Sequence, residues 1–588
     1  MQNIPIRITS MGPADFGKST LFGYIILHHL NDPNYWKQIA AWEQEKPDWY
    51  RKDRIYTYLF DKIQDERKGH LSQEGKRKFE GASIVPTYIE CTIGEKTYLF
   101  IDVPGHEKFI SNATTGIFQA QAAVLVLAAN DLEPLLDMIQ EINRYYDNQG
   151  TLVQHVRNSR FWNICFYPIL VRTYGFQQLI VVISKMDLVQ YDQLVYELSV
   201  EELRPFLAWF SDLPQQAIHV IPTSIQVEAR SDMNVIHAVP SEHPMSWYQG
   251  PTVVEQIAQI PALQPSKGPL LIPVEEMYLK RVPGSPCIVT GRIIRGTLSK
   301  DQEIQISPLC DPAKEFHDTE KLRGRVKHVR QRDQKAQLPW IGKIPLESPA
   351  QDQQFEAGHI IGLTFHPHGK TKYSPEKYPL YFRKGCIITN AGDAVISGNV
   401  VMAELFVPIY SRKIAEGQQW LVYLYGQKKG DALVLSVCPR EEQLREDEKE
   451  IGDVVEVELL LGFPVDYPGV NGIIDADVQD VVLRQNTSFC GGRVLRLYFI
   501  ERCEMMLTYT PETFPEKEEI LTPFQRFYHL AKLHTLPDIF TSVQDRWHIV
   551  MPHPTSEEMS LLYHTVKKMK PGPGAYSIEL FPKYQTYE

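Results

Sequence analysis

The feature that most constrains this chain is the segment Gly12–Thr20, which has the sequence GPADFGKST. An apolar run that predicts a buried strand precedes it, and the stretch LFGYIILHHL, which predicts a helix, follows it. A strand, a loop of the pattern GxxxxGK[ST] and a helix form a phosphate-binding loop. Gly12 and Gly17 permit backbone angles that turn several N–H groups toward one point, which the positive end of the helix also faces. We therefore expect Lys18 to contact phosphate oxygens and the Ser19 hydroxyl to bind Mg²⁺.

Length and composition limit the class of protein. The chain has 588 residues, too many for one hydrophobic core, so we expect about three or four domains. Its contents of 43% hydrophobic and 23% charged residues are ordinary for a soluble globular protein. The net charge of −11 does not indicate a nucleic-acid binder, although it leaves room for a local basic face.

Cysteine usage and hydropathy indicate a cytoplasmic protein without a membrane contact. The eight cysteines form no CxxC pair, which argues against structural zinc and against a disulfide framework. No apolar stretch is long enough to span a bilayer, and the N-terminal strand leaves no room for a signal peptide. Histidines near the C-terminus are irregularly spaced, which favours core or surface histidines over a metal site. They are His529, His534, His548, His553 and His564.

Other segments place polar residues at the ends of apolar strands. The strand KTYLFIDV, Lys96–Val103, runs into the turn DVPGHEKF, where Asp102 would face the metal and the Gly105 N–H a γ-phosphate. The segment FQQLIVVISKMD ends at Asp187, which can accept two hydrogen bonds from the N1 and the exocyclic amine of guanine. Strands of this kind alternate with helices, which predicts an α/β, doubly wound, mostly parallel sheet with ligands at the carboxyl ends of its strands.

Taken together, GPADFGKST, DVPGHEKF, SKMD and TSI occur in the order and at the approximate spacing of the translational GTPases. The chain most resembles elongation factor 1-alpha and elongation factor Tu. YTYLFDKIQDER, HEKFISNATTGIFQAQAAVLVLAA and HPMSWYQGPTVVEQI also resemble segments of that family's GTP-binding domain. CIVTGRIIRGTLSKDQEIQI resembles the second, β-barrel domain of the elongation factors. The resemblance implies GTP or GDP as nucleotide, Mg²⁺ as cofactor and GTP hydrolysis as activity.

The resemblance also implies roles for individual residues. Ser19, Asp102 and Ser83 would bind Mg²⁺, since Ser83 aligns with the threonine of the family's first switch segment. His106 would be the catalytic residue that orients the attacking water, and Ser224 would support the guanine through the loop backbone. The expected nucleotide contacts are Gly12, Asp15, Gly17, Lys18, Ser19, Thr20, Gly105, Ser184, Lys185, Asp187, Ser224 and Ile225.

The chain departs from the family's pattern at two places. The family's NKxD begins with Ser184 here, and this shorter side chain is expected to lose some contact with the base and the phosphate loop. Asp187 should still select guanine over adenine. Bulky apolar residues that flank the catalytic histidine of elongation factor Tu correspond to Ala14 and Ala82. We therefore expect GTP hydrolysis to be less strongly restrained by apolar side chains around the histidine, or to be controlled by another group such as Phe16.

Four regions are expected along the chain. They are an α/β P-loop GTPase domain over residues 1–265, a β-barrel domain over 266–396, a β-barrel-like domain over 397–502 and a small α+β extension over 503–588. In the extension, FQRFYHLAKLHTL and TSEEMSLLYHTVKKM predict amphipathic helices, and WHIVMP and AYSIELFP predict strands. Residues 68–80 and about 30 residues near 132–165 are insertions relative to the family. Insertions of this size lie on the surface and often contact partners.

The resemblance implies a GTP-binding, GTP-hydrolysing, translation-factor-like switch that acts with aminoacyl-tRNA and the ribosome. The tRNA-contacting signatures of the family's third domain are not recognisable here, and two alternatives stay open. One is a GTPase regulatory subunit of a metabolic enzyme, of the kind that partners sulfate adenylyltransferase, and the other is a GTP-binding scaffold with weak turnover. A nucleotide exchange factor or another protein partner would contact the insertions or the C-terminal extension.

Overall fold

The computed structural model divides into two compact units. These are Met1–Gly268, Thr290–Lys300 and His328–Leu363 in the first unit, and Pro269–Val289, Asp301–Lys327 and Thr364–Glu588 in the second. The structure describes residues 4–30, 33–45, 52–60, 70–71, 77–78, 83–144, 156, 159, 161–225, 235–237, 244–262, 264–278, 287–309, 320–331, 354–368, 386–439, 452–470, 473–475, 480–508, 516, 518, 538–542, 546–568 and 577–584.

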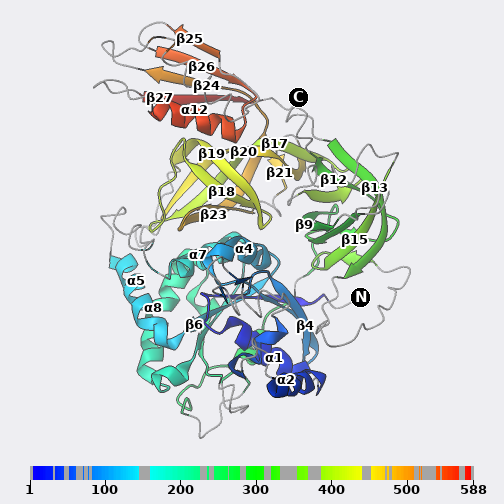
Figure 1. The fold of residues 1–588 in the computed structure, drawn as a ribbon, viewed down its shortest axis with the longest axis vertical. Coiled ribbons are helices and arrows are strands. Elements are labelled where there is room, and N and C mark those ends of the chain that lie inside the picture. Colours follow the sequence, from blue (N-terminus) through cyan, green and yellow to red (C-terminus); the bar gives the residue numbers. More distant parts are fainter. Residues whose placement is uncertain are drawn as a thin grey trace. The chain divides into compact units, whose positions relative to one another are not determined.

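A six-stranded sheet forms the centre of the N-terminal domain (Figure 1). Its strand order is β4 (Thr87–Ile93), β5 (Lys96–Asp102), β1 (Ile6–Met11), β6 (Ala122–Ala128), β7 (Leu179–Ser184) and β8 (Ile218–Pro222). All neighbours pair in parallel except β4, which is antiparallel to β5. Every residue of β1, β6 and β7 is buried, because a parallel strand in this position is covered on both faces. The predicted doubly wound α/β sheet is confirmed.

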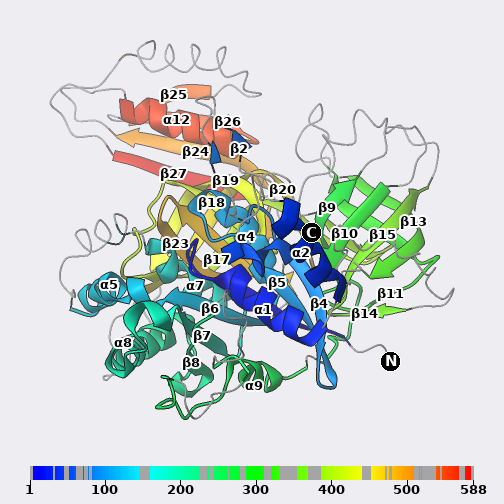
Figure 2. The ribbon, with the colours of Figure 1, turned by 60° about the horizontal axis from the view of Figure 1, so that its bottom comes forward.

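Helices surround this sheet (Figure 2). They are α1 (Lys18–Leu30), α2 (Pro33–Glu45), α4 (Ile110–Phe118), α5 (Leu132–Arg144), α7 (Trp162–Thr173), α8 (Gln193–Ser211) and α9 (Val253–Ala258). Helix α1 contacts β1, β4 and β5, while α8 contacts β8 and is itself packed against α5 and α7. The first predicted insertion contributes a short antiparallel pair, β2 (His70–Leu71) and β3 (Arg77–Lys78), and its other residues lie outside the described ones.

A closed barrel follows the N-terminal domain, as the sequence predicts. In order around the barrel, its strands are β10 (Cys287–Arg292), β15 (Ile360–Pro367), β13 (Glu320–Gln331), β12 (Glu303–Leu309), β16 (Ile387–Asn390) and β9 (Ile272–Tyr278). Two short strands, β11 (Thr297–Leu298) and β14 (Phe355–Glu356), form a separate antiparallel pair. Along the chain, β11 follows β10 and β14 precedes β15. The turn before β11 contains Gly296 with a φ of 78°, a left-handed conformation that glycine adopts without steric cost.

A second, seven-stranded antiparallel sheet comes next. It consists of β17 (Val395–Pro408), β18 (Gln419–Leu424), β19 (Gln427–Pro439), β20 (Gly452–Val470), β21 (Ile473–Ile474), β22 (Asp480–Gln485) and β23 (Ser488–Tyr498). Strand β17 pairs with both β20 and β23. The sheet therefore closes on itself, which agrees with the predicted barrel-like architecture and leaves few free strand edges.

The C-terminal region forms a four-stranded sheet with one helix. The sheet order is β25 (Asp538–Ser542), β26 (Arg546–Pro552), β24 (Ile500–Thr508) and β27 (Ser577–Tyr584), and the helix is α12 (Ser556–Lys568). The predicted helix start is confirmed, since the Thr555 hydroxyl accepts the Glu558 N–H and the Glu558 carboxylate accepts the Thr555 N–H. The other predicted helix, FQRFYHLAKLHTL, lies outside the described residues.

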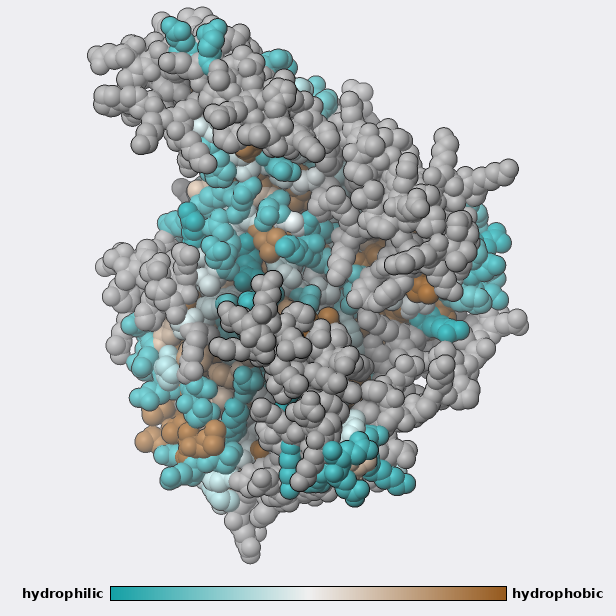
Figure 3. Space-filling view, in the orientation of Figure 1, coloured by the Kyte–Doolittle hydropathy of each residue, from teal (hydrophilic) through white to brown (hydrophobic). Residues whose placement is uncertain are grey.

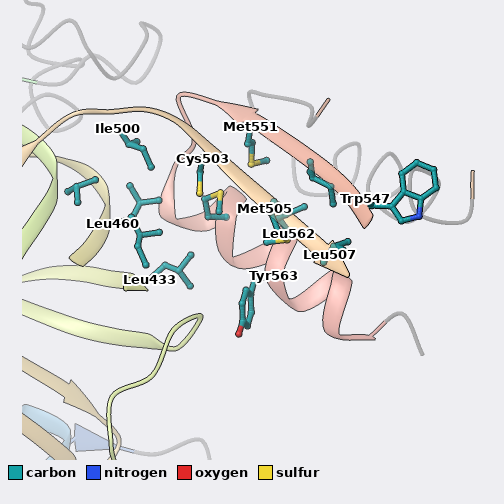
Figure 4. Close-up of a cluster of buried hydrophobic side chains, with 14 residues drawn as sticks. Leu433, Leu460, Ile500, Cys503, Met505, Leu507, Trp547, Met551, Leu562 and Tyr563 are labelled. Atoms are coloured by element: carbon teal, nitrogen blue, oxygen red, sulfur yellow. The ribbon is translucent and has the colours of Figure 1, made fainter. Parts of the chain in front are cut away.

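Alternation along β24 explains how this region packs. Cys503, Met505 and Leu507 are buried and face α12, whose Leu562 is also buried (Figure 4). Leucines of β19 and β20 join the same cluster. The C-terminal sheet, α12 and the second barrel-like sheet thus share one hydrophobic core, and apolar burial contributes to the attachment of the C-terminal region.

Two surface properties bear on partners. Of the helices that the structure describes, none has the length and apolar character required to cross a membrane. An apolar area appears at the lower left of the surface in Figure 3, on the side where α8 lies in Figure 1. Helix α8 carries Leu194 and Leu198, which are 60% and 48% exposed, and Leu188 is 58% exposed. Exposed apolar areas of this kind are typical of contact surfaces.

Replacement of Leu562 by alanine should destabilise the C-terminal region by about 2–5 kcal/mol, because it leaves a cavity in the shared core. The measurement is native-state hydrogen exchange of the α12 amides in the full chain. His564→Ala, at an exposed position of the same helix, should change protection by less than about 0.5 kcal/mol. Equal protection in Leu562→Ala and the unmodified protein would show that α12 does not depend on this core.

Candidate nucleotide-binding site

The loop between β1 and α1 has the backbone of a phosphate-binding loop. Gly12, Asp15 and Gly17 have φ values of 135°, 63° and 92°. A Cβ atom on Gly12 would overlap the Val126 carbonyl oxygen of the neighbouring strand β6, so only glycine fits there. The Lys18 ammonium is buried inside the loop and donates to the Pro13 carbonyl oxygen at 2.6 Å. Burial lowers the pKa of Lys18 to about 8, and the charges of Asp102 and Asp15 oppose this shift.

The three residues expected to bind Mg²⁺ lie together at the end of β5. One carboxylate oxygen of Asp102 accepts hydrogen bonds from the Ser19 hydroxyl at 2.7 Å and the Ser83 hydroxyl at 3.2 Å. Its other oxygen accepts the Ser10 hydroxyl at 2.8 Å. Burial raises the pKa of Asp102, and these hydroxyls together with the Lys18 charge oppose the shift. Carboxylate and hydroxyl oxygens are hard ligands, so the residues present fit a magnesium ion.

The turn after β5 lies against the phosphate-binding loop. A Cβ atom on Gly105 would overlap the Lys18 ammonium and would lie 2.7 Å from the Ala14 nitrogen, so a side chain at this position would displace the loop. His106 follows directly and caps a short helical turn, where its Nδ1 accepts the Lys108 N–H at 3.3 Å. Its ring is half-buried, and the ring centroid lies 6.0 Å from that of Phe109.

The residues expected to bind guanine lie beside the same loop. Lys185 adopts the left-handed conformation with a φ of 58°, and its ammonium donates to the Asp15 carbonyl at 2.7 Å. The Ser224 hydroxyl donates to one carboxylate oxygen of Asp187 at 2.6 Å, which leaves the other oxygen to face a ligand. Ile225 is half-buried and follows Ser224 at the end of the described segment.

Ser184 contacts the phosphate-binding loop in spite of its short side chain. Its hydroxyl lies 2.7 Å from the Phe16 carbonyl and 3.1 Å from the Leu127 carbonyl. β7 and the loop thus lie close enough for a serine to reach, and the loss of some contact relative to the family's asparagine stays a prediction.

Of the three residues expected to control hydrolysis, the structure describes Phe16 and Ala14. Phe16 is 7% exposed and packs against Phe161, with ring centroids 6.3 Å apart. Its ring is therefore turned into the domain interior. Ala14 is half-buried, as is Thr20 in the first turn of α1. Ala82 lies outside the described residues.

Two further residues belong to the site although no sequence motif contains them. Ser10 orients Asp102, and Tyr167 of α7 donates from its hydroxyl to the Gly12 carbonyl at 3.1 Å. A polar residue inside an otherwise buried strand was the signal for Ser10. Tyr167 lies in an apolar helix, where an aromatic residue is ordinary core, so the sequence carried no signal for it.

The C-terminal histidines do not form a second site in the part of the chain that the structure describes. His548 hydrogen bonds to Glu504 at 2.8 Å. Within the described ranges, no three His, Cys, Asp or Glu residues are arranged to hold a metal ion. His529 and His534 lie outside these ranges.

Comparison with known proteins agrees with the geometry. Residues 4–244 match the family model of the elongation factor Tu GTP-binding domain. Among curated proteins, elongation factor 1-alpha of Aeropyrum pernix is 29% identical over 308 residues, covering 52% of this chain and 60% of that protein. Elongation factor 1-alpha of Hyperthermus butylicus is 30% identical over 307 residues, with 52% and 60% covered. The chain thus spans about three fifths of the length of these relatives.

A solved structure shows the same fold over most of the chain. The GTPase-like domain of S. cerevisiae Ski7, bound to GDP and inorganic phosphate, superposes with a TM-score of 0.59 at 16% sequence identity. The superposition covers 84% of this chain and 97% of the Ski7 chain. Residues 4–244 are thus similar to the GTP-binding domain of elongation factor Tu, and these similarities are consistent with a divergent translational GTPase.

Proposed function

We propose that this protein binds GTP with Mg²⁺, hydrolyses it to GDP and phosphate, and works as a translation-factor-like switch with aminoacyl-tRNA and the ribosome. One observation carries the proposal. Ser19 of the phosphate-binding loop and Ser83 before β4 both donate hydrogen bonds to the same carboxylate oxygen of Asp102, at the end of β5. These three segments are distant in sequence, and a nucleotide-dependent switch requires them to meet beside the γ-phosphate.

Each residue then has a defined task. Lys18 and the loop N–H groups bind the phosphates, while Ser19, Ser83 and Asp102 hold the magnesium ion. When bound, that ion neutralises charge on the phosphate oxygens. His106 orients the attacking water. The Gly105 N–H contacts the γ-phosphate, which only the triphosphate presents, and Ser83 contacts the metal ion beside that phosphate. Loss of the γ-phosphate on hydrolysis therefore releases both segments.

Translation factor, regulatory subunit and scaffold all bind GTP, so these three hypotheses share the nucleotide, and the protein's partner distinguishes them. The exposed leucines at positions 188, 194 and 198 begin directly after Asp187 and offer an apolar surface for a protein, such as an exchange factor. This surface favours a protein partner next to the guanine site. It is the observation that keeps the regulatory-subunit and scaffold hypotheses in view beside tRNA delivery.

Asp187→Asn should reverse base preference, because an amide donates where the carboxylate accepts. We expect about a 100-fold loss of GDP affinity and a gain in XDP affinity, given that a lost hydrogen bond to a charged group costs about 1.5–3 kcal/mol. Binding is measured by calorimetry with GDP, XDP and ADP. Asp192→Asn is the matched control, since Asp192 caps α8 through the Leu194 N–H and asparagine caps equally well. Equal affinity of the unmodified protein for ADP and GDP would refute the guanine assignment.

His106→Ala should lower the single-turnover rate of GTP hydrolysis by at least about tenfold without changing GTP affinity, because orientation of the attacking water contributes at the transition state. His368→Ala, at an exposed histidine that hydrogen bonds to Glu303 of the barrel, serves as the control. An unchanged rate in His106→Ala would remove this residue from the mechanism.

Partner binding distinguishes translation from the alternatives. The protein loaded with a non-hydrolysable GTP analogue should retain aminoacyl-tRNA at least about tenfold better than the GDP-loaded protein, as expected when differential affinity drives a two-state switch. The retained RNA and protein are identified after size-exclusion chromatography. Retention of a metabolic enzyme without RNA would support the regulatory-subunit hypothesis, and GTP turnover below the detection limit would support the scaffold.

A further inference from the structure

Side-chain donors hold the carbonyl oxygens of the phosphate-binding loop. Four of its five carbonyl oxygens from Gly12 to Phe16 accept such a hydrogen bond. The pairs are Tyr167 to Gly12 at 3.1 Å, Lys18 to Pro13 at 2.6 Å, Lys185 to Asp15 at 2.7 Å and Ser184 to Phe16 at 2.7 Å. A peptide plane whose carbonyl is fixed on one side presents its neighbouring N–H groups toward the other, where phosphate oxygens bind.

Three of these donors belong to the motifs that identify the family, but Tyr167 belongs to none of them. Tyr167 lies on α7, is 1% exposed and places its hydroxyl on the first residue of the loop. Burial raises the pKa of this hydroxyl, so it stays protonated and remains a donor over the whole working range of pH.

Helix α7 touches the loop at a second point. Phe161, the residue that precedes α7, packs against Phe16 with ring centroids 6.3 Å apart. The first and the fifth residues of the loop are therefore both braced by one helix, by a hydrogen bond at Gly12 and by an aromatic contact at Phe16. Since α7 also packs against α8, its position relative to the loop is fixed by the domain core.

We propose that Tyr167 is a positioning residue that sets how tightly the phosphate-binding loop holds its nucleotide. The proposal rests on the proposed function of the same site. Gly12 has a φ of 135°, and its carbonyl is buried beneath Tyr167. Without the hydroxyl, this buried carbonyl has lost its donor, and the start of the loop has lost its hydrogen bond to α7. The peptide between Gly12 and Pro13 carries no N–H, so the effect on phosphate binding comes from displacement of the N–H groups that follow Pro13 along the loop.

The test uses the full-length protein and the variant Tyr167→Phe. A fluorescent GDP analogue should dissociate about tenfold faster from the variant than from the unmodified protein. Tyr196→Phe is the matched control, since the Tyr196 hydroxyl donates to the Val220 carbonyl at 2.9 Å in the same domain but away from the loop. Both variants should show similar decreases in Tm without nucleotide, and only Tyr167→Phe should change the dissociation rate.

A second readout separates positioning of the phosphates from a general loss of structure. Guanosine has no phosphate, so it makes no contact with the phosphate-binding loop. Its inhibition constant, measured by competition with the fluorescent GDP analogue, should differ by less than about twofold between Tyr167→Phe and the unmodified protein, while the affinity for GDP falls in the variant. Equal losses for guanosine and GDP would overturn the proposal. So would a GDP dissociation rate in Tyr167→Phe that matches Tyr196→Phe.

A third variant keeps the proposal testable if Tyr167→Phe does not fold. Incorporation of 4-aminophenylalanine at position 167 retains a donor in place of the hydroxyl, and it should restore slow dissociation to within about threefold of the unmodified protein. Fast dissociation from a folded 4-aminophenylalanine variant would contradict the role of the donor. If the unmodified protein binds no guanine nucleotide at all, the proposed function itself fails, which is a different result from an unchanged Tyr167→Phe.

Discussion

The buried carboxylate of Asp102 is the interaction on which the nucleotide site depends. It is 1% exposed, and it joins three separate parts of the chain through hydroxyl donors: Ser10 in β1, Ser19 at the start of α1 and Ser83 before β4. A buried carboxylate is costly without partners, and these donors together with the nearby Lys18 charge compensate for that cost. The same group that stabilises the site without ligand is therefore the one that fits a metal ion.

The opposite side of the site is organised by carbonyl oxygens rather than by a carboxylate. Lys18, Ser184 and Lys185 each donate to the phosphate-binding loop from within a motif, and Tyr167 adds a donor from α7. Gly105 lies close to Lys18, since a Cβ atom on Gly105 would overlap the Lys18 ammonium. This arrangement makes loop geometry sensitive to α7 as well as to the switch segments, and it links nucleotide retention to the packing of the domain core.

Much of the fold and part of the site could be predicted from the sequence. Fully apolar strands such as β6 and the alternation of strands and helices indicate a doubly wound sheet, and Thr555 and Glu558 mark the start of α12 by local hydrogen-bonding chemistry. The sequence could not show that Ser184 reaches the loop, because that contact depends on the distance between β7 and the loop. Tyr167 was missed because its position in an apolar helix is typical of core.

The sequence by itself determined where the motifs lie: it has glycines at two loop positions where the backbone has positive φ, and it carries Lys18 and Asp187, the residues that we propose for the phosphate and for the base. These properties depend on residue type and on spacing over a few residues, which backbone geometry converts directly into local structure. Only the tertiary structure decided that Ser10 and Ser83 share one carboxylate and that Tyr167 reaches Gly12. Those contacts join residues far apart in the chain, so they depend on how helices and strands pack and not on any local pattern.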